Sequence, residues 1–135
     1  MGNATITDLL GNQYSGLTPL EIVERGLPSY TVELLVEVLD LTIDEVCRII
    51  HVSRRTLARY RNRTLNPHLS DHILMVYNVY ERTVEVMESS ENAKIWLKNP
   101  NKVFRFRRPL DYLSSFAGSQ EVLDELGRLQ HGVFV

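Results

Sequence analysis

The chain has 135 residues, of which 44% are hydrophobic, and its formal net charge at pH 7 is −2. This composition excludes a disordered chain, and the length suffices for one domain with a real core, or for one domain with a small appendage. Its single cysteine excludes an intrachain disulfide framework, and because no signal-peptide pattern and no apolar run of membrane-spanning length occurs, we expect a cytoplasmic protein with no membrane partner.

Segments with helical periodicity, separated by turn residues, predict an all-α fold. Residues 1–17 are rich in Gly, Asn and Thr, and we expect them to be loosely ordered. Two capping boxes and a capping serine then mark helix starts. The predicted helices of the first half are a helix capped by Thr18 and stopped by Gly26, one over 31–39, one from Thr42 to about Ile50, and one capped by Ser53 and reaching about Asn62.

After the Asn66-Pro67 break, the pattern predicts a long helix and a smaller group of helical segments. The predicted elements are a helix from about Ser70 to Met87, one from Ser90 to Leu97, a connection over 101–108 that can be extended, a helix from Pro109 stopped by Gly118, and one capped by Ser119 that runs to about Gln130 and is closed by Gly132. We therefore predict an N-terminal helix-turn-helix bundle at 18–88 followed by a small helical domain at 89–135.

Residues 46–70 carry six arginines and no acidic residue, although the whole chain is slightly acidic. The pattern predicts two short helices separated only by His51 and Val52, with arginines concentrated on the second. Such a basic helix is typical of proteins that enter the major groove, where the planar guanidinium pairs with the O6 and N7 atoms of guanine. The predicted DNA-binding residues are Ser53, Arg54, Arg55, Thr56, Arg59 and Arg63.

Two features of this motif qualify the interpretation. Arginines can simply solvate an exposed helix, but a solvated face normally mixes both charge signs, and no acid lies within the run. His51 stands where helix-turn-helix motifs often have glycine, and histidine tolerates the left-handed backbone better than bulky residues do.

We expect a homodimer, since a two-fold pair matches a palindromic operator. The long helix, with Tyr77, Tyr80, Val84 and Met87, is the expected contributor to the dimer interface.

No catalytic or metal-binding constellation is predicted. His68 and His72 are four residues apart, but no third ligand is evident nearby, and the chain has no glycine-rich phosphate loop and no GxSxG motif. We therefore expect neither enzyme activity nor a metal or cofactor.

A second basic run, 94–108, has Phe104 and Phe106 interleaved with six bases, which suits contact either with nucleic acid or with an acidic protein surface.

Four short motifs follow one another from Ser53 to the C-terminus. They are the run from Ser53 to Arg59; Ala93 with Trp96-Leu97 and Pro100-Asn101; Pro109-Leu110-Asp111 with Leu113, Gly118 and Val122; and Leu126, Arg128 and Gly132-Val133. In this order they resemble the Xre/MbcA/ParS-type antitoxins of type II toxin-antitoxin systems, which neutralise RES-domain toxins. The chain departs from the family before Pro109, where a glycine is common and this sequence has residues 104–108 as FRFRR.

The resemblance implies a two-part antitoxin. The first half would bind a palindromic operator in its own promoter and repress its operon, and the second would block the active site of a RES-domain toxin that degrades NAD. NAD chemistry belongs to that partner, so no cofactor is expected here. The implied toxin-binding residues are Arg128, Gln130, His131, Gly132, Val133, Phe134 and Val135.

The apolar C-terminal end is also typical of a binding element, because no chain follows in this sequence to bury it. The alternative interpretation is a plain dimeric helix-turn-helix transcriptional regulator. In that case the C-terminal region would serve dimerisation or effector binding.

Overall fold

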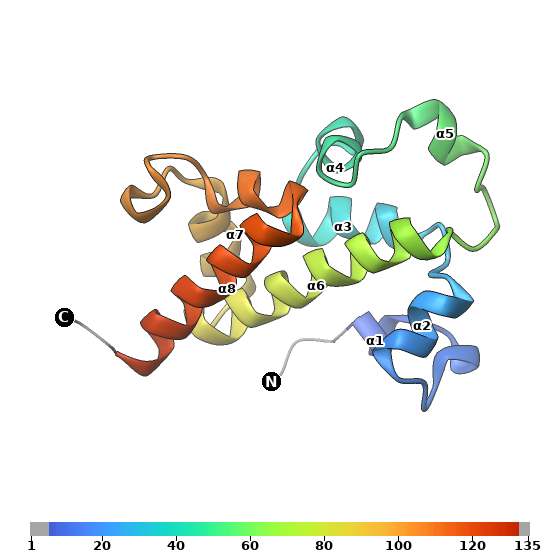
Figure 1. Ribbon diagram of the computed structural model, residues 1–135, viewed down its shortest axis with the longest axis horizontal. Helices are drawn as coiled ribbons and strands as arrows, with labels where there is room; N and C mark the ends of the chain where they lie inside the picture. Colours follow the sequence, from blue (N-terminus) through green and yellow to red (C-terminus); the bar gives the residue numbers. More distant parts are fainter. Residues whose placement is uncertain (1–5, 133–135) are drawn as a thin grey trace. The chain divides into compact units, whose positions relative to one another are not determined.

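The computed structural model describes residues 6–132, and this part of the chain folds into helices without a β-strand (Figure 1). The chain divides into two compact units, residues 1–77 and 78–135. The prediction of an all-α fold is therefore confirmed. No helix among the described residues is long and apolar enough to span a membrane.

The first unit contains six helical elements and the beginning of a seventh. They are α1 (Ile6–Leu9), the 3-10 helix η1 (Asn12–Tyr14), α2 (Pro19–Arg25), α3 (Thr31–Leu39), α4 (Ile43–Ile49), α5 (Arg54–Ala58) and the start of α6 (Pro67–Met87). Both predicted capping boxes form, at Thr18 with Glu21 and at Thr42 with Glu45. Gly26, with φ 92°, ends α2 as the sequence predicts.

Residues 6–17 contain the short helices α1 and η1 and pack through three buried side chains, Ile6, Leu10 and Tyr14, where the sequence predicts loose order. Ile6 and Tyr14 are buried, and the Tyr14 hydroxyl donates a hydrogen bond of 2.6 Å to the Gly26 carbonyl. The Arg25 guanidinium donates to the Gln13 carbonyl and lies 5.8 Å from the centroid of the Tyr14 ring. Tertiary contacts with α2 therefore hold a segment whose own sequence is a poor helix former.

The arginine-rich helix α5 ends at Ala58 and not at the predicted Asn62. Beyond it the chain continues in tight turns, with Tyr60 N–H donating to Leu57 (3.0 Å) and Arg63 N–H donating to Tyr60 (2.8 Å). The turns bring Leu65 N–H to within 2.8 Å of the Leu27 carbonyl. A longer α5 would carry the chain away from this pairing, so a tertiary contact sets the helix end.

Helix α6 begins at Pro67, three residues before the predicted start. Asn66 supplies the cap, because its side-chain Oδ1 accepts from Leu69 N–H at 2.8 Å, and proline suits the first helical position. Ser70 is fully buried inside α6, where its hydroxyl accepts from Leu27 N–H (2.9 Å) and donates to the Leu65 carbonyl (3.2 Å). The Ser70 side chain thus connects α6 to the segment before α3 and to the turns after α5.

The second unit contains the remainder of α6, α7 (Ser90–Lys98), the 3-10 helices η2 (Lys102–Phe104) and η3 (Pro109–Ser114), and α8 (Phe116–His131). Its core is built from the buried side chains of Ala93, Leu97, Phe104, Leu110, Leu113, Val122 and Leu126. The last helix, α8, ends at His131 and is closed by Gly132, as predicted, with a left-handed φ of 62°.

The junction between η3 and α8 differs from the prediction. Gly118 lies inside α8 and does not stop a helix, and the cap is Ser115, whose Oγ accepts from Gly118 N–H at 2.9 Å. A Cβ atom at Gly118 would lie 2.2 Å from the Tyr112 carbonyl oxygen. Glycine is therefore required here by the close approach of α8 to η3, which sequence spacing alone does not reveal.

We expect the Gly118→Ala variant to lose about 1–3 kcal/mol of unfolding free energy, because the added methyl group must displace backbone. Thermal unfolding followed by circular dichroism measures the effect. Gly127→Ala in the same helix is the matched control, since nothing lies within 4 Å of its Cβ position. The control should gain up to about 1 kcal/mol from helix propensity. Equal melting temperatures for the two variants would contradict the packing account.

Three of the residues expected at a dimer interface lie inside the chain. Tyr77, Tyr80 and Val84 are all buried, and the Tyr77 hydroxyl donates to the Thr31 carbonyl at 3.4 Å. The apolar stripe of α6 therefore serves the core of this chain. The prediction that these three side chains contribute to a dimer interface is wrong.

Candidate functional site

Helices α4 and α5 form a helix-turn-helix whose turn has the predicted geometry. Val46, Ile50 and Val52 are buried, so α4 and the turn are tied to the core of the first unit, whereas α5 contains no buried residue. His51 has φ 56°, the left-handed conformation expected at the position that often holds glycine. Ser53 caps α5, accepting from Thr56 N–H at 3.0 Å. The start of α5 is therefore held in a defined direction relative to α4.

The predicted DNA-binding side chains lie on and just after α5. Ser53 and the four arginines at 54, 55, 59 and 63 are exposed, while Thr56 is half-buried. No ion pair involves Arg55, Arg59 or Arg63 among residues 6–132. Their charges are available to phosphates or base edges.

Arg54 has an acidic neighbour, Asp44, which precedes the arginine run in the sequence. Its Nη1 atom lies 3.6 Å from Oδ1 of Asp44, near the start of α4, and both side chains are about two-thirds exposed. Such an exposed pair contributes little to stability. Asp44 lowers the local positive charge beside Arg54.

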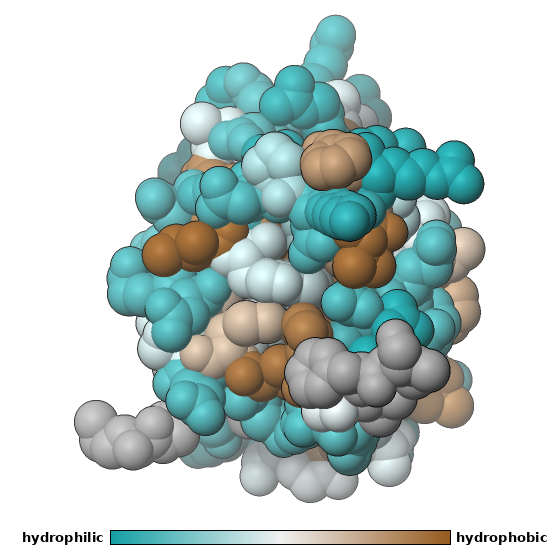
Figure 2. Space-filling view, turned by 90° about the vertical axis from the view of Figure 1, so that its left-hand side faces the viewer, coloured by the Kyte–Doolittle hydropathy of each residue, from teal (hydrophilic) through white to brown (hydrophobic). Residues whose placement is uncertain are grey.

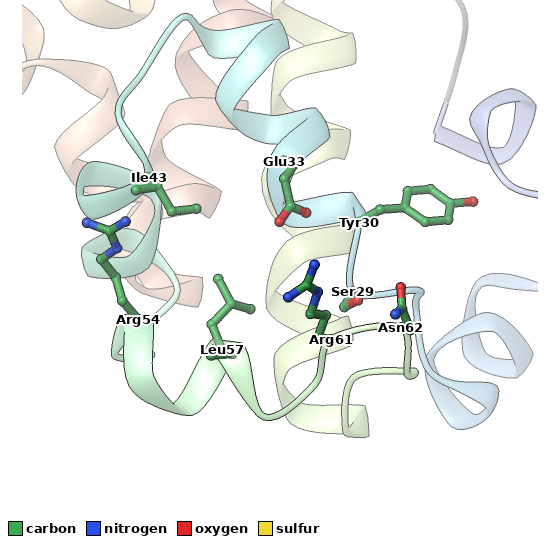
Figure 3. A pocket seen from close by; sticks show the side chains of 9 residues that line it. Ser29, Tyr30, Glu33, Ile43, Arg54, Leu57, Arg61 and Asn62 are labelled. Atoms are coloured by element: carbon green, nitrogen blue, oxygen red, sulfur yellow. The ribbon is translucent and has the colours of Figure 1, made fainter.

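A pocket of about 490 Å³ lies beside α5 (Figure 3). Its lining comes from the segment before α3, from α3, α4 and α5, and from the turns after α5: Ser29, Tyr30, Glu33, Ile43, Arg54, Leu57, Ala58, Arg61 and Asn62. Figure 3 shows the Arg61 and Glu33 side chains pointing toward each other across it. Arg61 belongs to the arginine run but was not among the predicted contacts, and only the short length of α5 reveals its direction.

Two further groups near the turn have structural explanations. Burial raises the pKa of the Cys47 thiol, which keeps it protonated and unreactive at neutral pH. The His72 ring lies 5.9 Å from the His51 ring and belongs to the packing of the turn. Within the described part of the chain no three His, Cys, Asp or Glu side chains gather as a metal site would require.

The C-terminal residues of the predicted toxin site are partly engaged within their own unit. Arg128 Nε donates to Glu125 Oε1 at 2.9 Å, and Gln130 hydrogen-bonds both Glu85 (3.4 Å) and Arg82 of α6. His131 is exposed at the end of α8, and Gly132 N–H donates to the Arg128 carbonyl. Val133, Phe134 and Val135 lie outside the described residues.

The second basic run is structured and is not an extended connection. Arg108 forms two side-chain hydrogen bonds to Asp111, the shorter of 2.7 Å, and these bonds lower the pKa of the Asp111 carboxyl group. Lys94 pairs with Glu91 at 3.8 Å. The Arg107 guanidinium lies 4.7 Å from the centroid of the Tyr112 ring. Several of these bases therefore stabilise the unit itself.

Two family models match the chain in sequence order. The Antitoxin Xre-like helix-turn-helix domain matches residues 18–76, and the Antitoxin Xre/MbcA/ParS C-terminal toxin-binding domain matches residues 82–132. The chain belongs to the Xre/MbcA/ParS antitoxin family. Each of the two compact units thus carries one domain of an Xre/MbcA/ParS antitoxin, and the predicted family is confirmed.

Individual members of the antitoxin family support this assignment. "Antitoxin Xre" of Yersinia enterocolitica is 31% identical over 93 residues, which are 67% of this chain and 63% of that relative. "Mycobacterial cidal antitoxin MbcA" of Mycobacterium tuberculosis is 29% identical over 107 residues, covering 78% of this chain and 93% of the relative. The chain thus spans under two thirds of the Yersinia antitoxin but nearly all of MbcA.

The fold agrees with a solved antitoxin complex. A chain in the crystal structure of the M. tuberculosis MbcT-MbcA toxin-antitoxin complex matches with a TM-score of 0.58 and 27% identity. The match covers 79% of this chain and 96% of that chain. An N-terminal helix-turn-helix domain followed by a helical C-terminal domain is therefore the shared architecture.

Proposed function

We propose that this antitoxin binds and blocks a RES-domain toxin that degrades NAD, and that it represses its own operon through its helix-turn-helix. The observation that carries the proposal is the order of the two matched domains, one on each compact unit. NAD chemistry belongs to the toxin in this account, and the antitoxin needs no cofactor. Because both partners, toxin and operator, are made and used inside the producing cell, we place its action in the cytoplasm.

Operator recognition is assigned to α5 and the turn after it. Arg55 and Arg59 are four residues apart and exposed, so both can reach one groove from the same side of a short helix. Ser53 and Thr56 supply hydroxyl groups at the N-terminus of the helix, where proteins commonly contact phosphate. Arg63 lies in the turns after α5, and we expect it to contact the phosphate backbone of the DNA.

Toxin blocking is assigned to the end of α8 and the residues beyond it. The Arg128–Glu125 and Gln130–Glu85 hydrogen bonds fix the last turns of α8, so the segment that follows starts from a rigid base. Phe134 is the proposed anchor in the toxin cleft, because a few well-placed aromatic and arginine side chains carry most of the energy of such contacts. Arg128 is 54% exposed in its side chain despite the ion pair, which leaves it available at the rim.

A homodimer is the form we propose to bind the operator, since one helix covers only a few base pairs. Because Tyr77, Tyr80 and Val84 are buried, the interface must use other, exposed side chains. Multi-angle light scattering at micromolar concentration, alone and with operator DNA, measures the assembly. We expect two antitoxin chains per operator, and a single chain in both samples would contradict the proposal.

Co-purification with the product of the adjacent gene tests the functional assignment as a whole. We expect a stable complex, and we expect the partner to consume NAD once freed from it. A plain transcriptional regulator would bind its promoter but retain no neighbouring gene product. Absence of a complex, with operator binding intact, would therefore favour that alternative.

A further inference from the structure

The connection between α7 and η3 is a closed loop organised by one residue, Asn101. Its carbonyl oxygen accepts from both Phe104 N–H and Phe106 N–H at 2.9 Å, and its N–H donates to the Arg107 carbonyl at 3.0 Å. Its side-chain oxygen accepts from Val103 N–H at 2.9 Å. Four hydrogen bonds to one residue hold the loop in a single conformation.

Phe104 anchors this loop to the second unit. Phe104 is buried. The centroid of its ring lies 6.1 Å from that of Trp96, in an edge-on arrangement, and 4.8 Å from that of Tyr112. The Tyr112 hydroxyl donates to the Phe104 carbonyl at 3.2 Å, and Arg107 covers the Tyr112 ring. The loop is therefore part of a rigid aromatic cluster.

Two large apolar side chains of the loop are left exposed. Phe106 is 71% exposed and Val103 is 54% exposed. Arg105 and Phe106 are consecutive residues in the left-handed region, with φ 57° and 63°. This backbone is uncommon for residues other than glycine, asparagine and aspartate. Folding alone would be served better by glycine at 106, so an exposed phenylalanine there points to a functional contact.

Charge around these side chains indicates the kind of partner. From Lys98 to Leu110, both included, the chain has five basic residues and no acidic one. Arg107 and Arg108 are engaged with Tyr112 and Asp111, which leaves Lys102 and Arg105 beside the exposed pair. An aromatic anchor with an arginine at its edge is the composition of a protein-interface hot spot. The complementary surface would be acidic around an apolar pocket.

The exposed apolar surface of the loop comes from two side chains. Within residues 102–107, the exposed large apolar side chains are Val103 and Phe106. The face drawn in Figure 2 shows separate hydrophobic patches on a largely hydrophilic surface. A rigid loop with a single protruding aromatic ring loses little conformational entropy on binding. Such a loop suits insertion into a pocket on a folded partner.

We propose that residues 102–107 form a second, preformed docking site for the toxin, in addition to the C-terminal segment. The inference rests on the proposed function, since the toxin is the partner, and it adds the chemistry of the toxin's surface. The toxin-binding domain match at 82–132 includes the loop, whereas the predicted operator contacts belong to the other unit. Phe106 fills an apolar pocket of the toxin, and Lys102 and Arg105 face carboxylates at its edge.

The decisive variant is Phe106→Gly, which removes the anchor but suits the left-handed backbone. We expect its melting temperature to equal or exceed that of the parent, while the dissociation constant for the purified toxin rises about 30-fold. Leu20→Ser, at a 67% exposed position in α2, is the control for loss of an exposed apolar side chain and should leave affinity unchanged. Biolayer interferometry with immobilised toxin gives both rate constants.

Arg105→Glu tests the charge argument independently. We expect its association rate to fall about tenfold at low salt and to become less dependent on salt, because steering by complementary charge is removed. Unchanged affinity of both variants, with the parent binding the toxin, would overturn the docking site alone. A parent that does not bind the toxin would instead overturn the proposed function. Weaker binding to single-stranded DNA by Phe106→Gly, with toxin affinity unchanged, would assign the loop to nucleic acid and overturn the inference.

Discussion

Operator binding by the Arg55→Ala and Arg59→Ala variants is expected to weaken by about 1–3 kcal/mol for each hydrogen-bonded base that the arginine no longer reaches. Both side chains are exposed and outside every ion pair of the described residues, so the fold should be unaffected. Fluorescence anisotropy with the native promoter fragment, at several salt concentrations, measures the weakening. Toxin inhibition should be unchanged, because it is assigned to the other unit.

The same titrations distinguish arginines that bind bases from arginines that bind phosphates. Removing an arginine that binds a phosphate reduces the salt dependence of operator binding, whereas removing one that binds a base relaxes sequence preference at one position. Arg105→Ala is the matched control, since it removes an exposed arginine from the second unit and should leave operator affinity unchanged. Operator binding as tight as that of the parent in both α5 variants would exclude α5 as the recognition helix.

Removing the last three residues, Val133 to Val135, is expected to abolish most of the inhibition of the toxin. The deletion leaves the Gly132 cap of α8 and the Gln130 hydrogen bonds in place, so the second unit should stay folded. Absence of the Phe134 anchor should raise the antitoxin concentration needed for half-inhibition by about 30-fold or more. Inhibition is measured as NAD consumption by the purified partner, with circular dichroism reporting on the fold.

Phe134→Ala is the companion variant, since it tests the anchor without shortening the chain. It should reproduce most of the effect of the deletion. Operator binding by both variants serves as the internal control and should match the parent. Equal inhibition by the parent and the shortened chain would transfer the blocking role to the helices between Pro109 and Leu129.

Features encoded locally were predictable from the sequence. Capping boxes at Thr18 and Thr42 and the cap at Ser53 set helix starts through side chains three residues from the backbone groups they bind. The turn at His51 followed from the narrow spacing between two periodic segments. These signals act over a single helical turn, so they require no knowledge of the tertiary structure.

Features set by tertiary contacts were not predictable. The early end of α5 depends on the pairing of Leu65 with Leu27, nearly forty residues apart in the sequence. Gly118 resembles a helix stop, yet its role is a close approach to the Tyr112 carbonyl. The same limit applies to the candidate sites. Asp44 beside Arg54, and the loop organised by Asn101, become visible only once the helices are in place.

We propose that this chain inhibits the NAD-degrading product of its neighbouring gene. The most direct test is to purify that toxin and to follow NAD consumption while full-length antitoxin is added. We predict that consumption falls to zero at a fixed ratio of antitoxin to toxin. NAD consumption should return when the chain lacking residues 133–135 replaces the full-length antitoxin. Undiminished NAD consumption in the presence of excess folded, operator-binding antitoxin would contradict the account.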